Sequence, residues 1–541
     1  MRILSTSFRW LCPCATALAL TFLCRGADLP ENVVLQYHFL GATQLAGNTN
    51  AATATKALTR KSTLPFEDLV FNRLSASLAA ALHFQTSSTN VALLRPLLDD
   101  LVRAESLASM GGAPGKPFNY VVAVRLDPQR AQVWQQNLNK ASGGHGEPLR
   151  ADTFTGWQWN KGASDSFWTV SARDWMLVGR GGDLSSVRAA YLQQIQKTGR
   201  PAPALGANWF EAVVDWPRMA SWFPVSSCPL RLGRTQIGIS AEKGGLHMIS
   251  KVTYSQPIQW HSQPWRIPTN LVRQPLVSFA TGQDVEPFFK SDDTLAQLCT
   301  NPLRDQFYFW SMGQMPFQTY MAWPTDNPSN VMRELSTQAM TALNPGLKGL
   351  NGTKLEWNPA QAQLVWTKFG LTSPTMGAAP ASNGQYLVAG LFPLTQGSGP
   401  APNELWTQFQ GRRDLVYYDW ERTGVRLVEL RTLTQVLPIL EALGVGPSGH
   451  PLAKGSGASE VASRLGIEEQ WLGGLTRMPG FTVTEVTKSG PNEVTVVRNS
   501  PLVFSSLEIV LLSHWLTDTP AGPVNMNLLP QPKVSGPGLP R

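Results

Sequence analysis

The sequence predicts an α+β fold built from two tandem duplicated halves, each a mainly antiparallel sheet with helices packed on it. Motifs of the first half recur in the same order in the second half, which indicates a repeat. The strand patterns within each half are joined by short turns, which favours antiparallel pairing. Helical patterns stand between them without regular alternation, as in α+β proteins. The 541 residues, 43% of them hydrophobic, are enough for more than one core.

The first 26 residues have the pattern of a secretory signal peptide. Arg2 and Arg9 precede an apolar run that extends from Leu11 to Leu23, and Cys24-Arg25-Gly26 follows it. The run is shorter than the roughly 20 residues of a membrane-spanning helix, and no other stretch approaches that length. We therefore expect export, with no transmembrane span in the mature chain. A lipid anchor on Cys24 is disfavoured, because bulky residues precede it where small ones are expected.

Removal of this segment leaves two cysteines, Cys228 and Cys299. In an oxidising compartment they either form a disulfide or stay as buried thiols, and the sequence favours the second alternative without excluding the first. The formal charge of +8 includes three arginines of residues 1–26 and falls to +5 without them. No run of three Lys or Arg residues occurs, so we expect no nucleic-acid partner.

Four landmarks occur twice, and the first three are separated by about 200 residues. They are SMGGAPGKPF (109–118) and SMGQMPF (311–317), the pair Trp159 and Trp168 against Trp357 and Trp366, DWPR (215–218) and DWER (419–422), and two hairpin patterns that end at Pro257 and Pro501. Their order is the same in both halves. We infer an internal duplication, with one repeat over 27–262 and another over 263–517, divided near the proline-rich stretch 255–270.

Local patterns predict the elements of each repeat. Alternating apolar residues predict strands over 33–41, 118–125, 153–160, 166–180, 208–215 and 235–255. Helical spacing predicts helices over 64–84, 91–105, 129–140 and 183–196. The second repeat carries a helical insertion near 423–478, and the capping-box pair Ser505 and Glu508 starts a helix that ends near Leu516. Residues 518–541 are rich in Pro and Gly, so we expect a disordered tail.

The segment 305–323, DQFYFWSMGQMPFQTYMAW, is rich in aromatic and Met side chains. Core packing explains it better than a ligand surface does, since aromatic rings bury large areas and dominate cores. On its second strand, side chains alternate between two faces. The face expected in the core holds Phe317, Thr319, Met321 and Trp323. The alternative is a carbohydrate-binding surface on the opposite side of this hairpin. Its rings are Tyr308, Trp310 and Tyr320.

The sequence offers little catalytic or metal-binding chemistry. Its seven histidines are scattered and form no HExxH motif, so we expect no metal site. GVGPSG (444–449) has the letters of a dinucleotide fingerprint but comes after a helix instead of a strand, so we expect no cofactor. Asp215 and Asp419, which the duplication presents twice, are weak catalytic candidates. The better explanation is that each ends a strand and caps the next element, with Arg218 or Arg422 as a local partner.

Several longer stretches resemble a known family. The stretches are LLRPLLDDLVRAES, WRIPTNLVRQPLVSF, FYFWSMGQMPFQTYMAWP, LVYYDWERTG and VTKSGPNEVTVVRNSPLVFSSLEIVLLSHWL, and they are similar to an uncharacterised family of exported bacterial proteins. The resemblance covers nearly all of the mature chain, and it implies export and a chain that belongs together as one unit. That family has no assigned activity, so the resemblance implies no site residues.

These observations favour an exported, non-catalytic binding or scaffolding protein of the bacterial cell envelope, located in the periplasm or the outer envelope. The sequence does not identify its partner, for which an envelope polymer or protein is the expectation. The alternative is a hydrolase that acts on an envelope or extracellular polymer, with Asp215 and Asp419 facing a cleft between the repeats.

Overall fold

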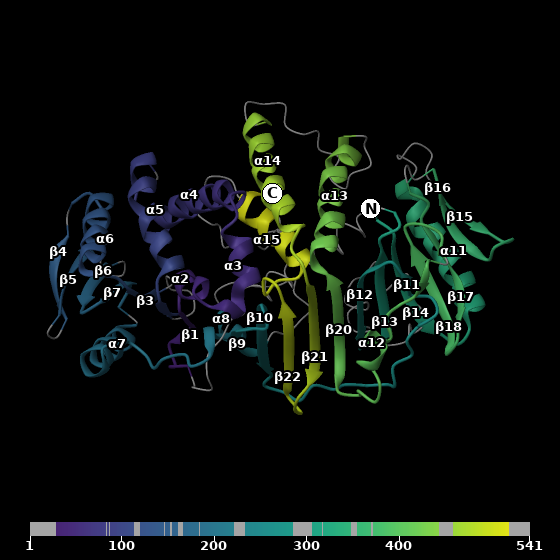
Figure 1. The fold of residues 1–541 in the computed structure, drawn as a ribbon, viewed down its shortest axis with the longest axis horizontal. Coiled ribbons are helices and arrows are strands. Elements are labelled where there is room, and N and C mark those ends of the chain that lie inside the picture. Colours follow the sequence, from purple (N-terminus) through teal and green to yellow (C-terminus); the bar gives the residue numbers. More distant parts are fainter. Residues whose placement is uncertain are drawn as a thin grey trace, which may run out of the picture. The chain divides into compact units, whose positions relative to one another are not determined.

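The computed structural model describes most of the chain between residues 29 and 518 (Figure 1). The gaps are residues 83, 86, 113–118, 145, 152–153, 161–165, 183, 221–232, 285–305, 316, 348–353, 369–371, 396 and 443–457. The signal segment, Cys228, Cys299, the GVGPSG motif and the tail from residue 519 lie outside the described residues. The described part divides into two compact units. The N-terminal unit holds residues 29–47, 67–238 and 515–518, and the C-terminal unit holds residues 48–66 and 239–514.

The strands described for the N-terminal unit form an antiparallel sheet. Their order across the sheet is β8 (Asn208–Asp215), β1 (Val33–Phe39), β2 (Ser106–Gly111), β3 (Asn119–Arg125), β7 (Trp175–Arg180), β6 (Ser166–Ala172), β5 (Phe154–Asn160) and β4 (Glu147–Ala151). The helices of this part are α2 (Ala42–Ala46), α4 (Thr63–Ala81, which begins in the C-terminal unit), α5 (Ser88–Arg103), α6 (Pro128–Ala141), α7 (Ser185–Thr198) and α8 (Trp216–Met219).

Helices cover both faces of this sheet. Phe167 and Met176 share a core with Trp134 of α6, while their neighbours Trp168 and Leu177 share a second core with α7. Successive strand residues point to opposite faces, so the two cores lie on opposite sides of the sheet. The sequence therefore reads as nearly continuous apolar runs in β6 and β7, because both of their faces are buried.

Short local signals start and end these helices. The hydroxyl of Ser87 accepts a hydrogen bond from the backbone N–H of Asn90 at the start of α5, and Asp127 accepts one from Arg130 at the start of α6. Each contact satisfies a backbone donor that the helix itself cannot satisfy. Helix α7 ends at Gly199, whose φ of 81° is the left-handed conformation that glycine adopts at low cost.

The strands described for the C-terminal unit also pair antiparallel. Their order is β15 (Lys354–Asn358), β16 (Gln363–Thr367), β17 (Thr375–Ala381), β18 (Gly384–Gly390), β14 (Thr319–Thr325), β13 (Gln306–Met312), β12 (Leu276–Gln283), β20 (Leu415–Arg422), β21 (Phe481–Lys488), β22 (Glu493–Ser500) and β10 (Gly245–Thr253). A separate two-stranded pair joins β11 (Arg273–Gln274) to β19 (Gly399–Pro400).

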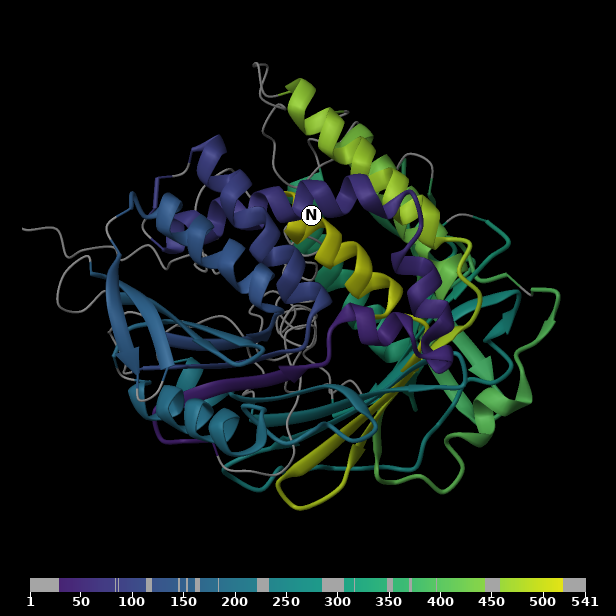
Figure 2. The ribbon, with the colours of Figure 1, turned by 60° about the vertical axis from the view of Figure 1, so that its left-hand side comes forward.

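The helices of the C-terminal unit pack on this sheet. They are η1 (Thr49–Ala51), α3 (Ala52–Leu58), α11 (Pro328–Leu347), α12 (Asn403–Thr407), α13 (Thr423–Ala442), α14 (Ala458–Leu475) and α15 (Ser506–Asp518, whose end belongs to the N-terminal unit). Figure 2 shows α14 and α15 on the same side of the yellow β21–β22 hairpin. An ion pair between Arg431 and Glu469 joins α13 to α14. The predicted insertion near 423–478 is therefore helical, as expected, where it is described.

The aromatic segment lies in the core, but its faces are reversed relative to the prediction. Tyr308, Trp310 and Tyr320 are 0 to 1% exposed and pack in one cluster with Phe279. The opposite face of the second strand, which was expected in the core, is only half-buried at Thr319, Met321 and Trp323. This strand is covered on both sides and carries apolar side chains on both faces. Its sequence therefore shows no clear alternation of apolar and polar residues, and the pattern could not identify the more buried face.

The boundary between the units differs from the expected one. It falls within β9 (Arg234–Glu242), before the proline-rich stretch, because β10 pairs with β22 over eight residue pairs. Residues 48–66 also belong to the C-terminal unit, where the N–H of Thr53 donates to the carbonyl of Gly244. In the part of the chain described here, we find no helix both long and apolar enough to span a membrane.

Two of the repeated landmarks occupy different places in the two sheets. Trp159 lies on β5, the second strand from its edge, whereas Trp357 lies on the edge strand β15. Asp215 is the last residue of β8, whereas Asp419 lies in the middle of β20. The Ser-Met-Gly landmark does occupy comparable places, since Ser109 pairs with Gln36 of β1 and Ser311 with Ser278 of β12.

Candidate functional site

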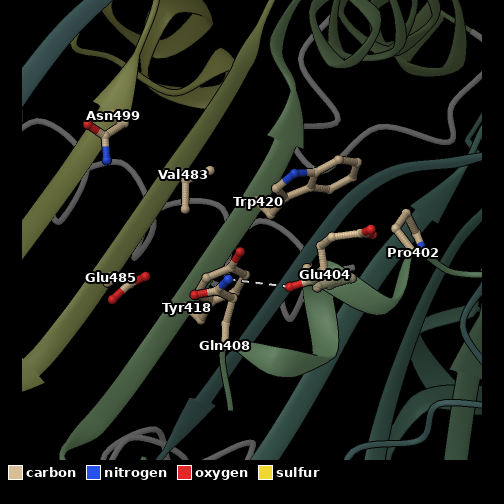
Figure 3. Close-up of a pocket in the computed structure, with 9 residues that line it drawn as sticks. Pro402, Glu404, Gln408, Tyr418, Trp420, Val483, Glu485 and Asn499 are labelled. Carbon is tan, nitrogen blue, oxygen red and sulfur yellow. Dashed lines mark hydrogen bonds between the residues drawn. The ribbon is translucent and has the colours of Figure 1, made fainter. Parts of the chain in front are cut away.

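A groove of about 300 Å³ lies on one face of the sheet in the C-terminal unit (Figure 3). Its walls come from α12 and from the neighbouring strands β20, β21 and β22. The lining residues are Pro402, Glu404, Leu405, Gln408, Tyr418, Trp420, Val483, Glu485 and Asn499. The strand residues among them share one face because of register, since Trp420 pairs with Val483 and Val483 with Asn499. The groove is therefore fixed by the pairing of the central strands.

Aromatic rings form one side of the groove. The ring of Trp420 stacks on Phe481, with centroids 5.4 Å apart and an interplanar angle of 25°. Phe481 is 54% exposed. Tyr418 lies below them, only 3% exposed, with its ring 5.0 Å from that of Phe409. Tyr418 and Trp420 thus give the groove an aromatic floor, and the exposed ring of Phe481 lies next to Trp420, outside the lining residues.

The polar groups of the groove are carboxylates and amides. Glu404 begins the first turn of α12, and Figure 3 shows its carboxyl on the side of the helix where Pro402 and Trp420 lie. Glu485 projects from the neighbouring strand and accepts a hydrogen bond of 3.3 Å from Arg412. The amide of Gln408 donates to the backbone carbonyl of Glu404 at 3.4 Å. Such groups accept and donate hydrogen bonds around an apolar floor, as in sites that orient small polar ligands.

Burial keeps the Tyr418 hydroxyl in its neutral form. The pKa of Tyr418 is raised above its ordinary value of 10.0, first by burial and then by the negative charges of Glu485 and Asp419. Among the described residues, the hydroxyl forms no hydrogen bond. It is a neutral donor and acceptor at the base of the groove.

The opposite face of β20 carries acids, which lie under α13 and α15. Asp419 has a pKa raised from 3.8 to about 8, chiefly by burial, with the charges of Glu421 and Glu508 adding and that of Arg498 opposing. It forms no hydrogen bond with any described residue. Glu421, 4% exposed, accepts hydrogen bonds of 2.7 Å from the N–H and the hydroxyl of Ser506. Burial also raises the pKa of Glu421.

A buried ion pair fixes α15 to the sheet. Arg498 of β22 donates two hydrogen bonds to Glu508, at 2.6 and 3.0 Å, and a third to Thr484 at 2.9 Å. Glu508 also accepts from the N–H of Ser505, while the Ser505 hydroxyl accepts from the N–H of Glu508. This confirms the predicted capping box. The helix start and the strand with the groove residue Asn499 are therefore held by one network.

The two acids proposed as catalytic candidates have different surroundings. Asp215 accepts hydrogen bonds from the backbone N–H of Arg218, at 3.1 Å, and from its side-chain Nε, at 2.7 Å. The capping explanation is thus confirmed for Asp215. It is wrong for Asp419, which lies four residues before α13 begins. The repeated Asp-Trp motif suggested that Asp215 and Asp419 occupy equivalent positions. By strand pairing, the acid in the N-terminal unit that corresponds to Asp419 is Glu211 instead. Glu211 pairs with His38 of β1, and Asp419 pairs with Ala280 of β12.

The three rings proposed as a carbohydrate surface do not form an open site. Tyr320 donates its hydroxyl to the carbonyl of Pro393 at 3.1 Å, and Tyr308 donates to Gln306 at 2.8 Å. Trp310 lies against Tyr320, with centroids 5.4 Å apart. Their near-complete burial leaves no ring face for a sugar, so this alternative is corrected. An exposed ring is found instead at Phe481, which stacks on Trp420.

The N-terminal unit holds its own buried charged cluster. Glu105, with a side chain 1% exposed, contacts His38 at 3.0 Å and accepts two hydrogen bonds from Arg200, at 2.7 and 2.9 Å. Burial alone would raise the pKa of Glu105, but the hydrogen bonds from His38 and Arg200 outweigh it, and the pKa is lowered. This cluster connects β1 and the start of β2 to the segment after α7. No described group of three or more His, Cys, Asp or Glu residues has the arrangement of a metal site.

Sequence reasoning missed the groove residues outside β20. No motif or pattern in the sequence marked Glu404, Gln408, Glu485 or Asn499 as a site residue. On β20, Trp420 was noticed only as part of the DWER landmark. One signal was present: in LVYYDWER, the residues Tyr418 and Trp420 alternate with Asp419 and Glu421, which predicts one aromatic and one acidic face. That pattern identifies the strand but not the distant segments that meet it.

The whole chain was compared with known protein families, curated proteins and solved structures. No protein-family model matches the sequence. No curated protein matches it, and no solved structure matches the fold. The groove and its surroundings are therefore the basis for a proposed function.

Proposed function

We propose that the protein is an exported, non-catalytic binding protein of the bacterial cell envelope, and that the groove holds a segment of a saccharide chain. The observation that carries the proposal is Trp420, which lines one groove with Glu404, Gln408 and Asn499 and stacks on the exposed ring of Phe481. Sugars present apolar C–H faces that pack on aromatic rings, and hydroxyls that pair with carboxylates and amides. The signal-peptide pattern of residues 1–26 supports a location where such chains are met.

Retention on insoluble polysaccharides tests this proposal. The purified mature protein is incubated at low salt with peptidoglycan sacculi, chitin and cellulose, and the bound fraction is measured after sedimentation. We expect retention on at least one of them. Trp420→Ala should weaken it about tenfold, since losing one stacked ring removes about 1.4 kcal/mol or more.

A matched substitution makes the result specific. Trp157 is 40% exposed in the N-terminal unit and serves as the control, because Trp157→Ala removes an exposed indole outside the groove. Equal retention of the Trp420→Ala variant and the wild type would contradict the proposal, as would no retention of the wild type on any of the three polymers. Circular dichroism of each variant checks that the fold is intact.

A hydrolase remains the second proposal because of Asp419 alone, and its substrate site would be separate from the groove, since Asp419 lies on the opposite face of β20. A carboxyl with a pKa near 8 is protonated at neutral pH, which suits a general acid. Asp215 no longer supports it, since both of its oxygens accept hydrogen bonds. Release of reducing ends from soluble polysaccharide fragments, abolished in Asp419→Asn, would support catalysis. Release that is unchanged in this variant would exclude Asp419 as its catalyst.

We also propose that the two units descend from a tandem duplication. The supporting observation is that the order β8-β1-β2-β3-β7-β6-β5-β4 has the same chain connectivity as β20-β12-β13-β14-β18-β17-β16-β15. The tryptophan and Asp-Trp landmarks argue against a simple residue-by-residue match, because they occupy different strand positions. A crystal structure tests the proposal: the eight strands of each unit should superpose in this order, and failure of β2 to coincide with β13 would contradict it.

A further inference from the structure

The polar groups of the groove are not fully used within the protein. Tyr418 is 3% exposed, and its hydroxyl has no hydrogen-bond partner among the described residues, although it lines the groove. Glu404 of α12 is exposed and also lines the groove, and its carboxylate has no hydrogen bond or ion pair with a described residue. Both groups are therefore available to a bound molecule.

The groove carries excess negative charge. None of its lining residues is Lys or Arg, while two are Glu. Arg412 contacts Glu485 at 3.3 Å but also Asp414 at 3.2 Å. The exposed Arg422 lies two residues beyond Trp420 on the same face of β20. The Arg412 guanidinium is shared by two carboxylates, and Glu404 forms no ion pair with a described residue. An anionic saccharide would be repelled, and a cationic one would be attracted.

The aromatic floor fits a cation as well. An ammonium group gains from the face of a Trp ring, the best of the aromatic side chains for this contact. Figure 3 shows Glu404 and Trp420 on the same side of the groove, so an ammonium group near the ring also lies near a carboxylate. Neutral hydroxyls of the same sugar would find Gln408, Asn499 and the Tyr418 hydroxyl.

We infer that the groove selects saccharides that carry free amines, such as chains of de-N-acetylated amino sugars, over the same chains with acetylated nitrogen. This inference rests on the proposed function and specifies its ligand. The selectivity lies in Glu404, which faces no competing cation among the described residues, and the affinity for sugar rings lies in Trp420. The two contributions are therefore separable by substitution.

Calorimetric titration of the purified mature protein with two tetrasaccharides tests the inference. The probes are β-1,4-linked glucosamine and β-1,4-linked N-acetylglucosamine of equal length. We expect the amine form to bind about fivefold or more tightly at about pH 6, where the amine is charged, and the preference to shrink at about pH 9, where it is neutral. Glu404→Gln should abolish the preference, and Trp420→Ala should weaken both ligands.

The outcomes separate the two proposals. Equal or tighter binding of the acetylated chain to the wild type overturns the inference and leaves the saccharide-binding function in place. Binding of neither chain, together with no retention on the insoluble polymers, overturns the function itself. The matched control is Glu356→Gln, an exposed acid of the same unit that lies on β15, outside the groove, and should keep the preference. A preference that survives Glu404→Gln also overturns the inference.

Discussion

Replacement of Asp419 by Asn should stabilise the protein, and more so as the pH rises. The native carboxyl has a pKa of about 8, whereas its ordinary value, which applies to the unfolded chain, is 3.8. The native state therefore holds its proton more tightly than the unfolded state does, and stability is lost as pH rises from about 4 to about 8. An amide does not titrate, so the variant lacks this loss.

The size of the effect depends on the width of that window. Each unit of pKa difference corresponds to about 1.4 kcal/mol, so the wild type should lose up to about 3 kcal/mol more than Asp419→Asn between about pH 5 and about pH 7. Part of the titration is shared with Glu421, which lies two residues away on the same face and also has a raised pKa. We therefore expect a measured difference of about 1 to 3 kcal/mol.

Urea denaturation at several pH values measures this difference. The free energies of unfolding of wild type and variant should converge near pH 4 and diverge steadily above it. Asp414→Asn is the control, because Asp414 has a side chain 47% exposed in a surface ion pair, which contributes at most about 1 kcal/mol. Parallel curves for wild type and Asp419→Asn over this range would refute the reasoning.

Three further substitutions test the buried networks and the core. Arg498→Met should cost about 3 to 5 kcal/mol in unfolding free energy, because it leaves the buried Glu508 without its ion-pair partner, and a loss below about 1 kcal/mol would contradict this. Glu105→Gln should be less stable than the wild type at pH 7, since the lowered pKa of Glu105 stabilises the fold above its ordinary 4.5. That deficit should shrink as pH falls below about 4, and a pH-independent deficit would argue against the ion-pair explanation. Trp310→Ala should cost about 3 to 5 kcal/mol by leaving a cavity, and a well-folded variant with unchanged thermal midpoint would show that the ring is not core.

The sequence predicted the elements better than the faces and partners of those elements. Strands such as β8 and helices such as α6 were placed within one or two residues, because alternation, helical spacing and caps are local signals. The buried faces of β13 and β14 were reversed, since covering both sides of a strand removes the alternation that reveals its orientation. The Asp215 cap was found because its partner is three residues away.

The groove could not be predicted from local sequence patterns, because distant segments of the chain form it. Glu404, Trp420 and Asn499 belong to α12, β20 and β22, which meet only through strand pairing over long distances in the chain. The raised pKa of Asp419 comes chiefly from burial under distant segments, and the charges of Arg498 on β22 and Glu508 on α15 lower and raise it respectively. The similarity of DWPR and DWER suggested equivalent positions that the structure does not show. DWPR begins at the last residue of β8, whereas all four residues of DWER lie within β20.

The pairing of β10 with β22 has a consequence for the nascent chain. His247 and Asn499 lie 252 residues apart, yet their side chains meet at 2.7 Å. At about 5 to 20 residues per second, a ribosome would take roughly 12 to 50 seconds between the two strands. Throughout that interval the edge of β10 has no β22 to cover it, and unpaired edges are sites of aggregation. A sheet that closes over 252 residues of chain therefore leaves this strand edge uncovered for longer than a sheet whose strands pair locally.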